Sequence, residues 1–438
     1  MSDAASLAKV ARDASDQRTL GGLPAMAGLS LLVGGAAGLV CGLFKWLLAR
    51  AEIWRTEFVV RSHDWQLAGL FVVVVMCAAA VALAVWLVRR FSPYASGSGI
   101  PHVEAVLNDE IPPAAPNLLM VKFTGGLLAI GAGLALGREG PSVQMGAILA
   151  KLIGGTFRRN WPDCRLLLAA GAGAGLAVAF NAPIAGAVFV LEELVRRFDI
   201  RTTIVTFGAS AGAIAVNRLL FGDTPDFLVE PLAHAGFGCL PLGLALGVLA
   251  GLLGVAYNRT LLGALSLANR LTTWPVPVRA AAVGAAVGLL GWWAPALVGG
   301  GDLLTQRALT GLDGGGMVIA IFLLRFGLGP VSYAVGTPGG LFAPLLVLGA
   351  QSGLFFGNAA HHWFPGLGIE PVAYAVTGMA AFFTAVVRAP LTGFILVIEL
   401  TGSYTQMLPM LAACFAAMLV ATLLNSPPIY DSLKQKVD

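Results

Sequence analysis

Long apolar runs, each long enough to cross a membrane, follow one another along almost the whole chain. The first begins near residue 23 and the last ends near residue 425, with about a dozen in all. Apolar residues are continuous within each run rather than alternating with polar ones, so the runs predict helices and exclude the strands of a β-barrel. The pattern therefore predicts an all-α, polytopic membrane protein.

The composition agrees with this fold class and narrows the function. Of the 438 residues, 57% are hydrophobic and only 11% are charged, and a soluble core of this length does not conceal so much apolar surface. The net charge of +4 is dispersed along the chain, so no nucleic-acid partner is expected. Neither the cysteines nor the histidines show a ligand or disulfide spacing, so no metal or cofactor is predicted.

Polar segments divide the chain into parts. The residues before the first apolar run are polar and basic and lack a signal-peptide core, which predicts a cytoplasmic N-terminal segment. The predicted order is that segment (1–22), repeat one (about 25–220), a linker (221–232), repeat two (about 235–425) and a short tail (431–438), the membrane domain covering 23–430.

The two halves share a repeated pattern, which is why they are called repeats. Residues 182–192 (APIAGAVFVLE) and 389–399 (APLTGFILVIE) are identical at five of eleven positions. In addition, GSGIPHVEAVL (97–107) has a counterpart in GGGDLLTQRAL (299–309), and the GREGP region has one at 336–344. Interrupted helices at matching positions indicate a transporter with its site at the bilayer midplane. The sequence leaves open whether the second repeat is inverted.

Two charged residues lie between apolar runs in Gly137-Arg138-Glu139-Gly140-Pro141. Charge at membrane depth is costly and indicates function. Glycine permits close backbone approach and proline suits the first helical position, so the segment predicts a helix that begins inside the membrane, its amide groups facing an anion. An ionised Glu139 would itself occupy the anion's place, whereas a protonated one would swing aside. The alternative is a permanent ion pair with Arg138.

Three glycine/proline breaks stand at predicted helix starts: 97–101 (GSGIP), 137–141 (GREGP) and 339–344 (GGLFAP). Each would present unpaired backbone N–H groups where no water is available. Three such ends directed at one point would form a cavity of partial positive charge without a full cation, which suits a permeating anion. The hydroxyl of Ser98 would add a further donor.

In this order, GSGIP, GREGP and residues 340–344 (GLFAP) resemble the CLC family of chloride channels and proton/chloride exchangers. VKFTGGL (121–127) and FNAPIAG (180–186) extend the likeness, which runs from about residue 25 to Tyr430. The resemblance implies two inverted repeats of tilted and broken helices, and a homodimer with one anion pathway per subunit. It also implies a multi-pass protein of the cell membrane, of the bacterial inner-membrane type, with both termini cytoplasmic.

The resemblance further implies roles for individual residues, with chloride and protons as transported ions. Glu139 would be the gating carboxylate, and Glu193 the inner proton-transfer residue. The chloride ligands would be the hydroxyls of Ser98 and Tyr430 and the amides of Leu341 and Phe342. An outer anion site would be framed by the backbone of Arg138, Glu139 and Gly140, and the motif glycines are Gly97, Gly99, Gly137 and Gly340.

The predicted function is secondary exchange of chloride for protons, not an enzymatic reaction. The alternative is a passive voltage- or proton-gated chloride channel. Glu139 does not separate the two, but Glu193 favours exchange, because channel relatives generally lack an acid there. The segment 208–212 (GASAG) matches the GxSxG pattern of hydrolases, yet it lies in an apolar run rich in small residues, where close helix packing is the ordinary explanation.

Other charged residues have structural interpretations. Glu193 itself has one, because Arg196 and Arg197 follow one turn later and are able to pair with it. The adjacent His361 and His362 predict an interfacial loop. The remaining charges within apolar runs predict structural pairs, with partners unassigned: Lys122, Arg325, Arg388 and Glu399.

Overall fold

The computed structural model describes residues 22–223, 225–233, 236–271 and 273–435. Within these ranges the regular secondary structure is helical, apart from two isolated backbone bridges. The predicted N-terminal segment up to residue 21 and the last three residues of the predicted tail lie outside the described residues.

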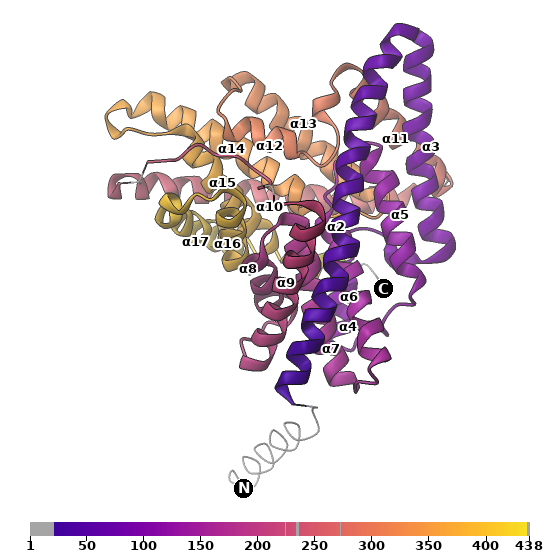
Figure 1. Cartoon of the computed structure of the whole chain (residues 1–438). Helices are drawn as coiled ribbons and strands as arrows, with labels where there is room; N and C mark the ends of the chain where they lie inside the picture. Colours follow the sequence, from indigo (N-terminus) through magenta and orange to yellow (C-terminus); the bar gives the residue numbers. More distant parts are fainter. Residues whose placement is uncertain (1–21, 224, 234–235, 272, 436–438) are drawn as a thin grey trace.

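The helices form two consecutive series, which interleave where a helix of the second packs on a helix of the first (Figure 1). The first series is α2 (Leu23–Ser62), α3 (Leu67–Phe91), α4 (Ile100–Leu107), α5 (Asn117–Gly131), α6 (Glu139–Thr156), α7 (Trp161–Phe180), α8 (Pro183–Phe189), the π-helical turn η3 (Val190–Leu194) and α9 (Ile200–Phe221). The second is α10 (Leu240–Arg270), α11 (Val276–Trp293), α12 (Asp302–Leu309), α13 (Gly315–Ala334), α14 (Phe342–Trp363), α15 (Pro371–Val387), α16 (Pro390–Thr401) and α17 (Met407–Leu423), followed by α18 (Ile429–Lys434).

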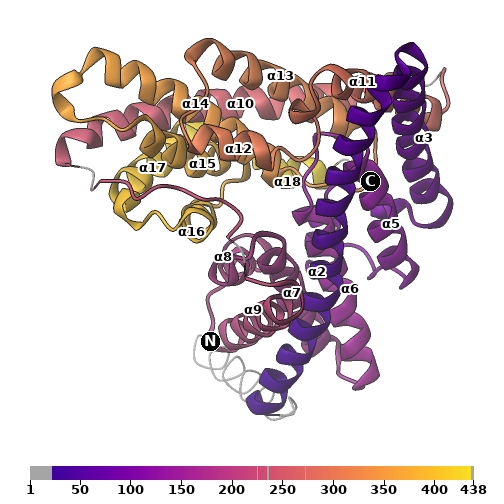
Figure 2. The same ribbon diagram turned by 45° about the horizontal axis from the view of Figure 1, so that its top comes forward.

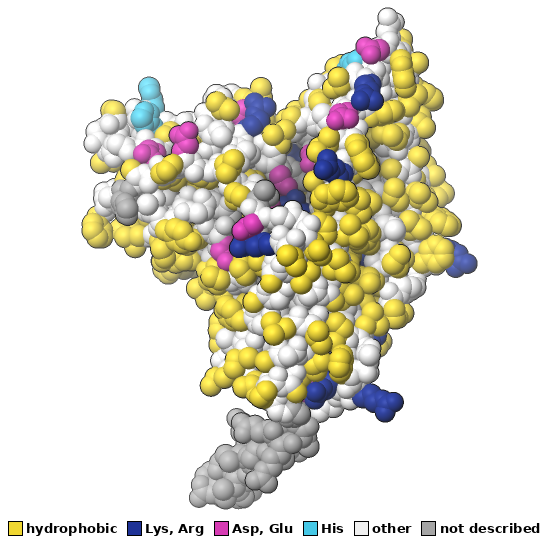
Figure 3. Space-filling view, in the orientation of Figure 1, with side chains coloured by type: hydrophobic (Ala, Val, Ile, Leu, Met, Phe, Trp, Pro, Cys, Tyr) yellow, Lys and Arg dark blue, Asp and Glu magenta, His cyan; other side chains and the backbone are white. Residues whose placement is uncertain are grey.

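Helix lengths agree with the predicted membrane protein. In the described ranges, nine helices are long and apolar enough to cross a membrane, and three further apolar helices are shorter. The first helix, α2, has 40 residues and is therefore about 60 Å long, roughly twice the hydrocarbon thickness. Apolar side chains cover much of the flank around α2 and α9, while charged side chains lie at the ends and in a group near the middle of this face (Figure 3).

Small residues let α2 and α9 pack with their backbones in contact. A Cβ atom added to Gly34 or Gly38 of α2 would collide with the backbone of Ala209 or Ala213 of α9. The GASAG segment lies within this helix, and Ser210 is buried. This confirms close packing as the reason for its small residues, since the hydrolase motif needs a strand-to-helix elbow.

The glycine-rich loops of the two repeats have the same local structure at equivalent positions. Gly99 and Gly301 precede α4 and α12, and both adopt the left-handed conformation that favours glycine, with φ of 83° and 102°. The ammonium of Lys122 donates to the carbonyls of Ala95 and Gly97, 3.1 and 2.8 Å away. In the second repeat, the Arg325 guanidinium donates likewise to the carbonyls of Leu297, Gly299 and Gly300.

The APIAG and APLTG helices cap one another. Glu192, at the end of the first copy, accepts hydrogen bonds from the amides of Leu391 and Thr392 at the start of α16. Glu399, at the end of the second copy, accepts from Ile184 and Ala185 at the start of α8. Each carboxylate thus satisfies orphan N–H groups of the other repeat, where a negative charge is favourable.

These contacts correct two expectations. The intramembrane charges were expected to form structural pairs, but in the described ranges the partners of Lys122, Arg325 and Glu399 are backbone groups, and Arg388 binds two carbonyls and the Thr422 hydroxyl. The reason is that glycine-rich loops and helix ends leave backbone carbonyl and N–H groups without partners. The carbonyls bind a nearby cation, and the N–H groups bind a nearby carboxylate. His361 and His362 lie not in a loop but in the last turn of α14, where both are exposed.

Equivalent residues meet where the two repeats join. Gly137 and Gly340 form an antiparallel bridge, each donating its N–H to the other's carbonyl, at 2.9 and 2.7 Å. Antiparallel pairing of two equivalent positions relates them by a local two-fold axis, as expected for two inverted repeats. Figure 2 shows α18 near this junction, where it packs on α4 of one repeat and α15 of the other.

Candidate functional site

Backbone hydrogen bonds hold the three glycine-rich loops together at the centre of the molecule. Gly97 donates to the carbonyl of Thr337 and accepts from the amide of Gly339, both at 3.0 Å. The Gly137–Gly340 bridge joins the remaining loop to the same segment. All three predicted breaks therefore lie together, as the prediction of three helix starts directed at one point requires.

Each break leads directly into a helix. α4 begins at Ile100, α6 at Glu139 and α14 at Phe342. α6 begins two residues ahead of Pro141, which was expected at the first helical position; because Pro141 lies within the first turn, its missing N–H costs no helical hydrogen bond. Glu139 is therefore itself the first residue of a helix whose start faces another helix start.

The Glu139 carboxylate lies against the start of α14. Its side chain is fully buried, and its Oε1 atom accepts a hydrogen bond of 3.2 Å from the amide of Ala343. Its Oε2 atom is buried without a hydrogen-bond partner. A Cβ atom on Gly137 would collide with the carboxylate, and one on Gly340 would collide with the carboxylate and with the backbone of Gly140, so glycine at both positions leaves room for the carboxylate. The carboxylate thus stands where a helix end would bind an anion.

Arg138 points away from Glu139, although the two are neighbours in the chain. Its guanidinium donates to the carbonyl of Ala179 at 2.9 Å and forms ion pairs with Asp302 and Asp226 at 2.8 and 3.3 Å. No ion pair within 4.0 Å joins Arg138 and Glu139 in the described ranges. The permanent Arg138–Glu139 pair considered above is therefore not formed, and the hydrogen bond that the Glu139 carboxylate accepts comes from a neutral amide.

Two hydroxyl groups are buried near the Glu139 carboxylate without hydrogen-bond partners. The side chains of Ser98 and Tyr430 are fully buried, and neither hydroxyl has a partner within hydrogen-bonding geometry, although the two groups interact with each other. The Ser98 hydroxyl lies 2.5 Å from where a Cβ on Gly140 would stand, beside the start of α6. Buried hydroxyls without partners are costly and indicate a ligand.

Tyr333 is a member of this group that the sequence analysis missed. Its hydroxyl accepts a hydrogen bond of 3.2 Å from the Ser98 amide and is close to Gly97. Tyr333 lies in α13, in the second repeat, and no motif marks it. Only the approach of α13 to the first break loop gives it a role, which is to orient Ser98.

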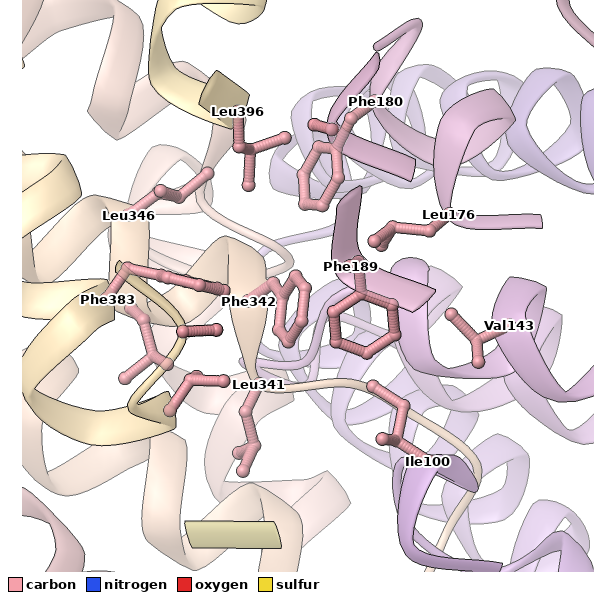
Figure 4. Packing of buried hydrophobic residues seen from close by; sticks show 14 of the residues in the cluster. Ile100, Val143, Leu176, Phe180, Phe189, Leu341, Phe342, Leu346, Phe383 and Leu396 are labelled. Carbon is pink, nitrogen blue, oxygen red and sulfur yellow. The ribbon is translucent and has the colours of Figure 1, made fainter. Parts of the chain in front are cut away.

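Aromatic and aliphatic side chains enclose the start of α14 (Figure 4). The Phe342 ring packs edge-on against Phe383 and Phe189, with ring centroids 4.6 and 5.6 Å apart. Leu341 is also fully buried. These contacts bury the side chains of Leu341 and Phe342 in the apolar core, and such surroundings strengthen any electrostatic interaction with the helix end.

Glu193 lies at a distance from these groups, towards the end of the molecule where α7 and α9 begin. It belongs to the π-helical turn η3, its side chain is buried, and its Oε1 atom has no hydrogen-bond partner. Arg196 forms an ion pair with it at 3.8 Å, so the pairing expected in the structural interpretation does occur. Glu192, its neighbour, is engaged in capping α16.

The site places one carboxylate, that of Glu139, beside neutral hydrogen-bond donors. In the described ranges no group of three or more His, Cys, Asp or Glu side chains is arranged to hold a metal ion. The donors that remain are helix-end amides and hydroxyls, which bind a small anion without the tight hold of a lysine or arginine.

Comparison with known sequences agrees with this chemistry. The family model for the voltage gated chloride channel matches residues 79–422. The chain is similar to the H(+)/Cl(-) exchange transporter ClcA of Vibrio cholerae serotype O1, with 39% identity over 414 residues that cover 92% of this chain and 88% of that protein. The transporter of the same name from Cronobacter sakazakii is 37% identical over 420 residues, with the same coverage of 92% and 88%.

Solved structures show the same architecture. The fold matches the X-ray structure of a slow cyanobacterial Cl-/H+ antiporter with a TM-score of 0.91 and 32% identity, covering 94% of this chain and 97% of that one. A eukaryotic CLC transporter matches with a TM-score of 0.79 and 23% identity, over 94% of this chain and 73% of that chain, which supports the fold alone. The chain therefore belongs to the CLC family, whose family model is that of the voltage gated chloride channel.

Proposed function

We propose that this protein exchanges chloride for protons across a membrane. The observation that carries the proposal is the position of Glu139, a fully buried carboxylate bound to the amide of Ala343 at a helix start. A carboxylate in this place competes with a permeating anion for the same donors. The similarity to proteins named as H(+)/Cl(-) exchange transporters supports the same reaction.

Exchange follows from the two protonation states of Glu139. The ionised carboxylate is attracted by the helix-end amides and excludes chloride from them. A proton removes the charge, so the side chain leaves and chloride takes its place. Chloride deeper in the pathway is bound by the hydroxyls of Ser98 and Tyr430 and by the amides of Leu341 and Phe342. Because the proton and the anion alternate at one position, their movements are coupled.

Glu193 is the second acid that this scheme needs, since a proton leaving Glu139 must reach the opposite side of the membrane. Its carboxylate is buried and has an oxygen without a hydrogen-bond partner. Glu193 lies towards the end of the molecule where α7 and α9 begin. This position suits a group that takes up protons from the cytoplasm. A passive channel has no use for such an acid.

The distribution of basic residues supports the proposed orientation. Arg158 and Arg159 lie in the short loop between α6 and α7, and Arg165 follows within the next turn of α7. Lysine and arginine are enriched in cytoplasmic loops, which supports assigning this end, where α2 also begins, to the cytoplasm. As the family resemblance implies, the protein is a homodimer, with one pathway per subunit, in a bacterial inner membrane.

A reversal-potential measurement tests the function directly. The purified protein is reconstituted into liposomes with equal chloride on both sides and a pH gradient, and protein-free liposomes serve as the control. Exchange shifts the reversal potential away from zero. A potential that stays at zero while chloride still moves would establish the passive channel instead.

A further inference from the structure

One guanidinium group is shared by three carboxylates near the cytoplasmic end of the proposed pathway. The Nη2 atom of Arg196 lies 2.9 Å from Asp431, 3.7 Å from Glu104 and 3.8 Å from Glu193. Its Nε atom donates to the carbonyl of Glu193 at 3.2 Å. Arg196 also adopts a φ of 54°, which is uncommon for a residue other than glycine.

The three carboxylates come from three different elements, one of which carries the proposed chloride ligand Tyr430 while another begins just after Ser98. Glu193 belongs to η3. Glu104 lies in α4, the helix that begins two residues after Ser98. Asp431 lies in α18, directly after Tyr430. Arg196 therefore connects the proposed inner acid to the segments that hold both hydroxyls.

The charges around Arg196 are unbalanced. Lys434 contributes a second cation, but it pairs with Glu104 at 3.6 Å and Glu110 at 2.6 Å. The carboxylate of Glu192 is already hydrogen-bonded to the start of α16. In the described ranges, Arg196 is the one cation within 4.0 Å of Glu193, and one oxygen each of Glu193 and Glu104 lacks a hydrogen bond. A single guanidinium cannot satisfy three carboxylates at once, so they compete for it.

We propose that Arg196 is a positioning residue that transmits the protonation state of Glu193 to Tyr430 through Asp431. When Glu193 is neutral, one competitor is lost, and Arg196 pairs more closely with Asp431. The pairing holds α18 in place and orients the Tyr430 hydroxyl towards chloride. When Glu193 is ionised, it draws Arg196 back and loosens α18. This inference rests on the proposed function only in taking Glu193 as the inner acid and Tyr430 as a chloride ligand.

A double-mutant cycle on chloride affinity tests the proposal, with calorimetry on the full-length protein. Glu193→Gln alone is expected to tighten chloride binding by roughly threefold or more. In the Arg196→Gln background, the same substitution is expected to have little effect, because the link to α18 is gone. A purely Coulombic effect of Glu193 on chloride would persist in that background. Equal effects in both backgrounds, or no effect in either, would overturn the proposal.

A matched control is available one residue later. Arg197 is exposed and forms no ion pair within 4.0 Å in the described ranges, so Arg197→Gln removes the same charge from the same segment. In this background, the effect of Glu193→Gln on chloride affinity is expected to remain in full. Its loss would show that net charge, not positioning, is responsible.

Two further variants guard against misfolding. Asp431→Asn breaks the link from the other end and is expected to reduce the effect of Glu193→Gln as Arg196→Gln does. Arg196→Lys keeps the charge but lacks the planar fork, so it restores only part of the effect. The double-mutant cycle measures chloride affinity, whereas the reversal potential measures the exchange of chloride for protons. A non-additive cycle without exchange would therefore reject the proposed function alone, whereas an additive cycle with exchange would reject the role of Arg196 alone.

Discussion

The Oε1 atom of Glu139 accepts a hydrogen bond from the backbone N–H of Ala343, 204 residues further along the chain and 3.2 Å away. The two residues stand at the facing starts of α6 and α14. A helix start attracts a negative charge by about 0.3–1 kcal/mol, and by up to about 2 kcal/mol in partly buried sites. The carboxylate is therefore bound firmly enough to close the position, yet weakly enough to be displaced.

The first prediction concerns removal of this carboxylate. Glu139→Ala should leave chloride movement through the protein intact and abolish its coupling to protons, because nothing then alternates with the anion. Chloride-driven proton uptake into liposomes measures the coupling. Exposed Glu230, replaced by alanine, serves as the control and should leave coupling unchanged. Continued proton uptake by Glu139→Ala would rule out the gating role.

The second prediction uses the glycine beside the carboxylate. A Cβ atom on Gly137 has three nearest neighbours, all of them atoms of the Glu139 carboxylate, and Gly137 does not have a positive φ. Gly137→Ala should therefore push the carboxylate out of its place and reduce proton coupling, while the fold is retained.

Gly327 provides the control for this substitution. It lies in α13 and a Cβ atom there would meet nothing within 4 Å, so Gly327→Ala should behave as the unchanged protein. Proton uptake per chloride, measured in liposomes, compares the two variants. Equal coupling in both would mean that Glu139 is not confined by Gly137.

The third prediction concerns the inner acid. Glu193→Gln should abolish proton transport while chloride still binds and moves, because the amide keeps the shape of the carboxylate but carries no titratable proton. Parallel measurements of proton and chloride flux check this outcome. A variant that fails to fold, or that loses chloride binding, would support a structural role for the ion pair with Arg196 instead.

The fourth prediction tests the hydroxyl of Tyr430. This group is fully buried without a hydrogen-bond partner, so Tyr430→Phe removes a chloride ligand and little else. A hydrogen bond to a charged group contributes about 1.5–3 kcal/mol, which predicts chloride binding weaker by roughly ten- to a hundredfold in calorimetry. Tyr374→Phe removes another buried, unpartnered hydroxyl away from the site and should leave the affinity unchanged.

The fifth prediction concerns stability. Glu399 caps α8 through the amides of Ile184 and Ala185, so Glu399→Ala should lower the free energy of unfolding in detergent by about 1–2 kcal/mol. Glu192→Ala should have a similar effect at the start of α16, where Glu192 makes the equivalent contacts. Glu230→Ala is again the control. An unchanged unfolding free energy would mean that other groups satisfy these helix starts.

Much of the fold and the site could be predicted because the signals involved are local. A run of apolar residues predicts a membrane helix wherever it stands, since the bilayer accepts few other structures. The breaks around Ser98, Glu139 and Phe342 are likewise readable, because glycine and proline act on the backbone at their own positions. Tyr333 and Asp431 escaped notice because each gains its role only from a residue far away in the chain.

The sequence by itself determined the helical membrane class, the repeat and the residues from which an anion site would be built. Tertiary structure alone decided their partners. It turned Arg138 towards Asp302 rather than Glu139, assigned Glu192 and Glu399 to opposite repeats, and placed the Glu139 carboxylate against the start of α14. The physical reason is that these contacts join segments more than a hundred residues apart. Their geometry depends on how the two inverted repeats pack, which no local pattern encodes.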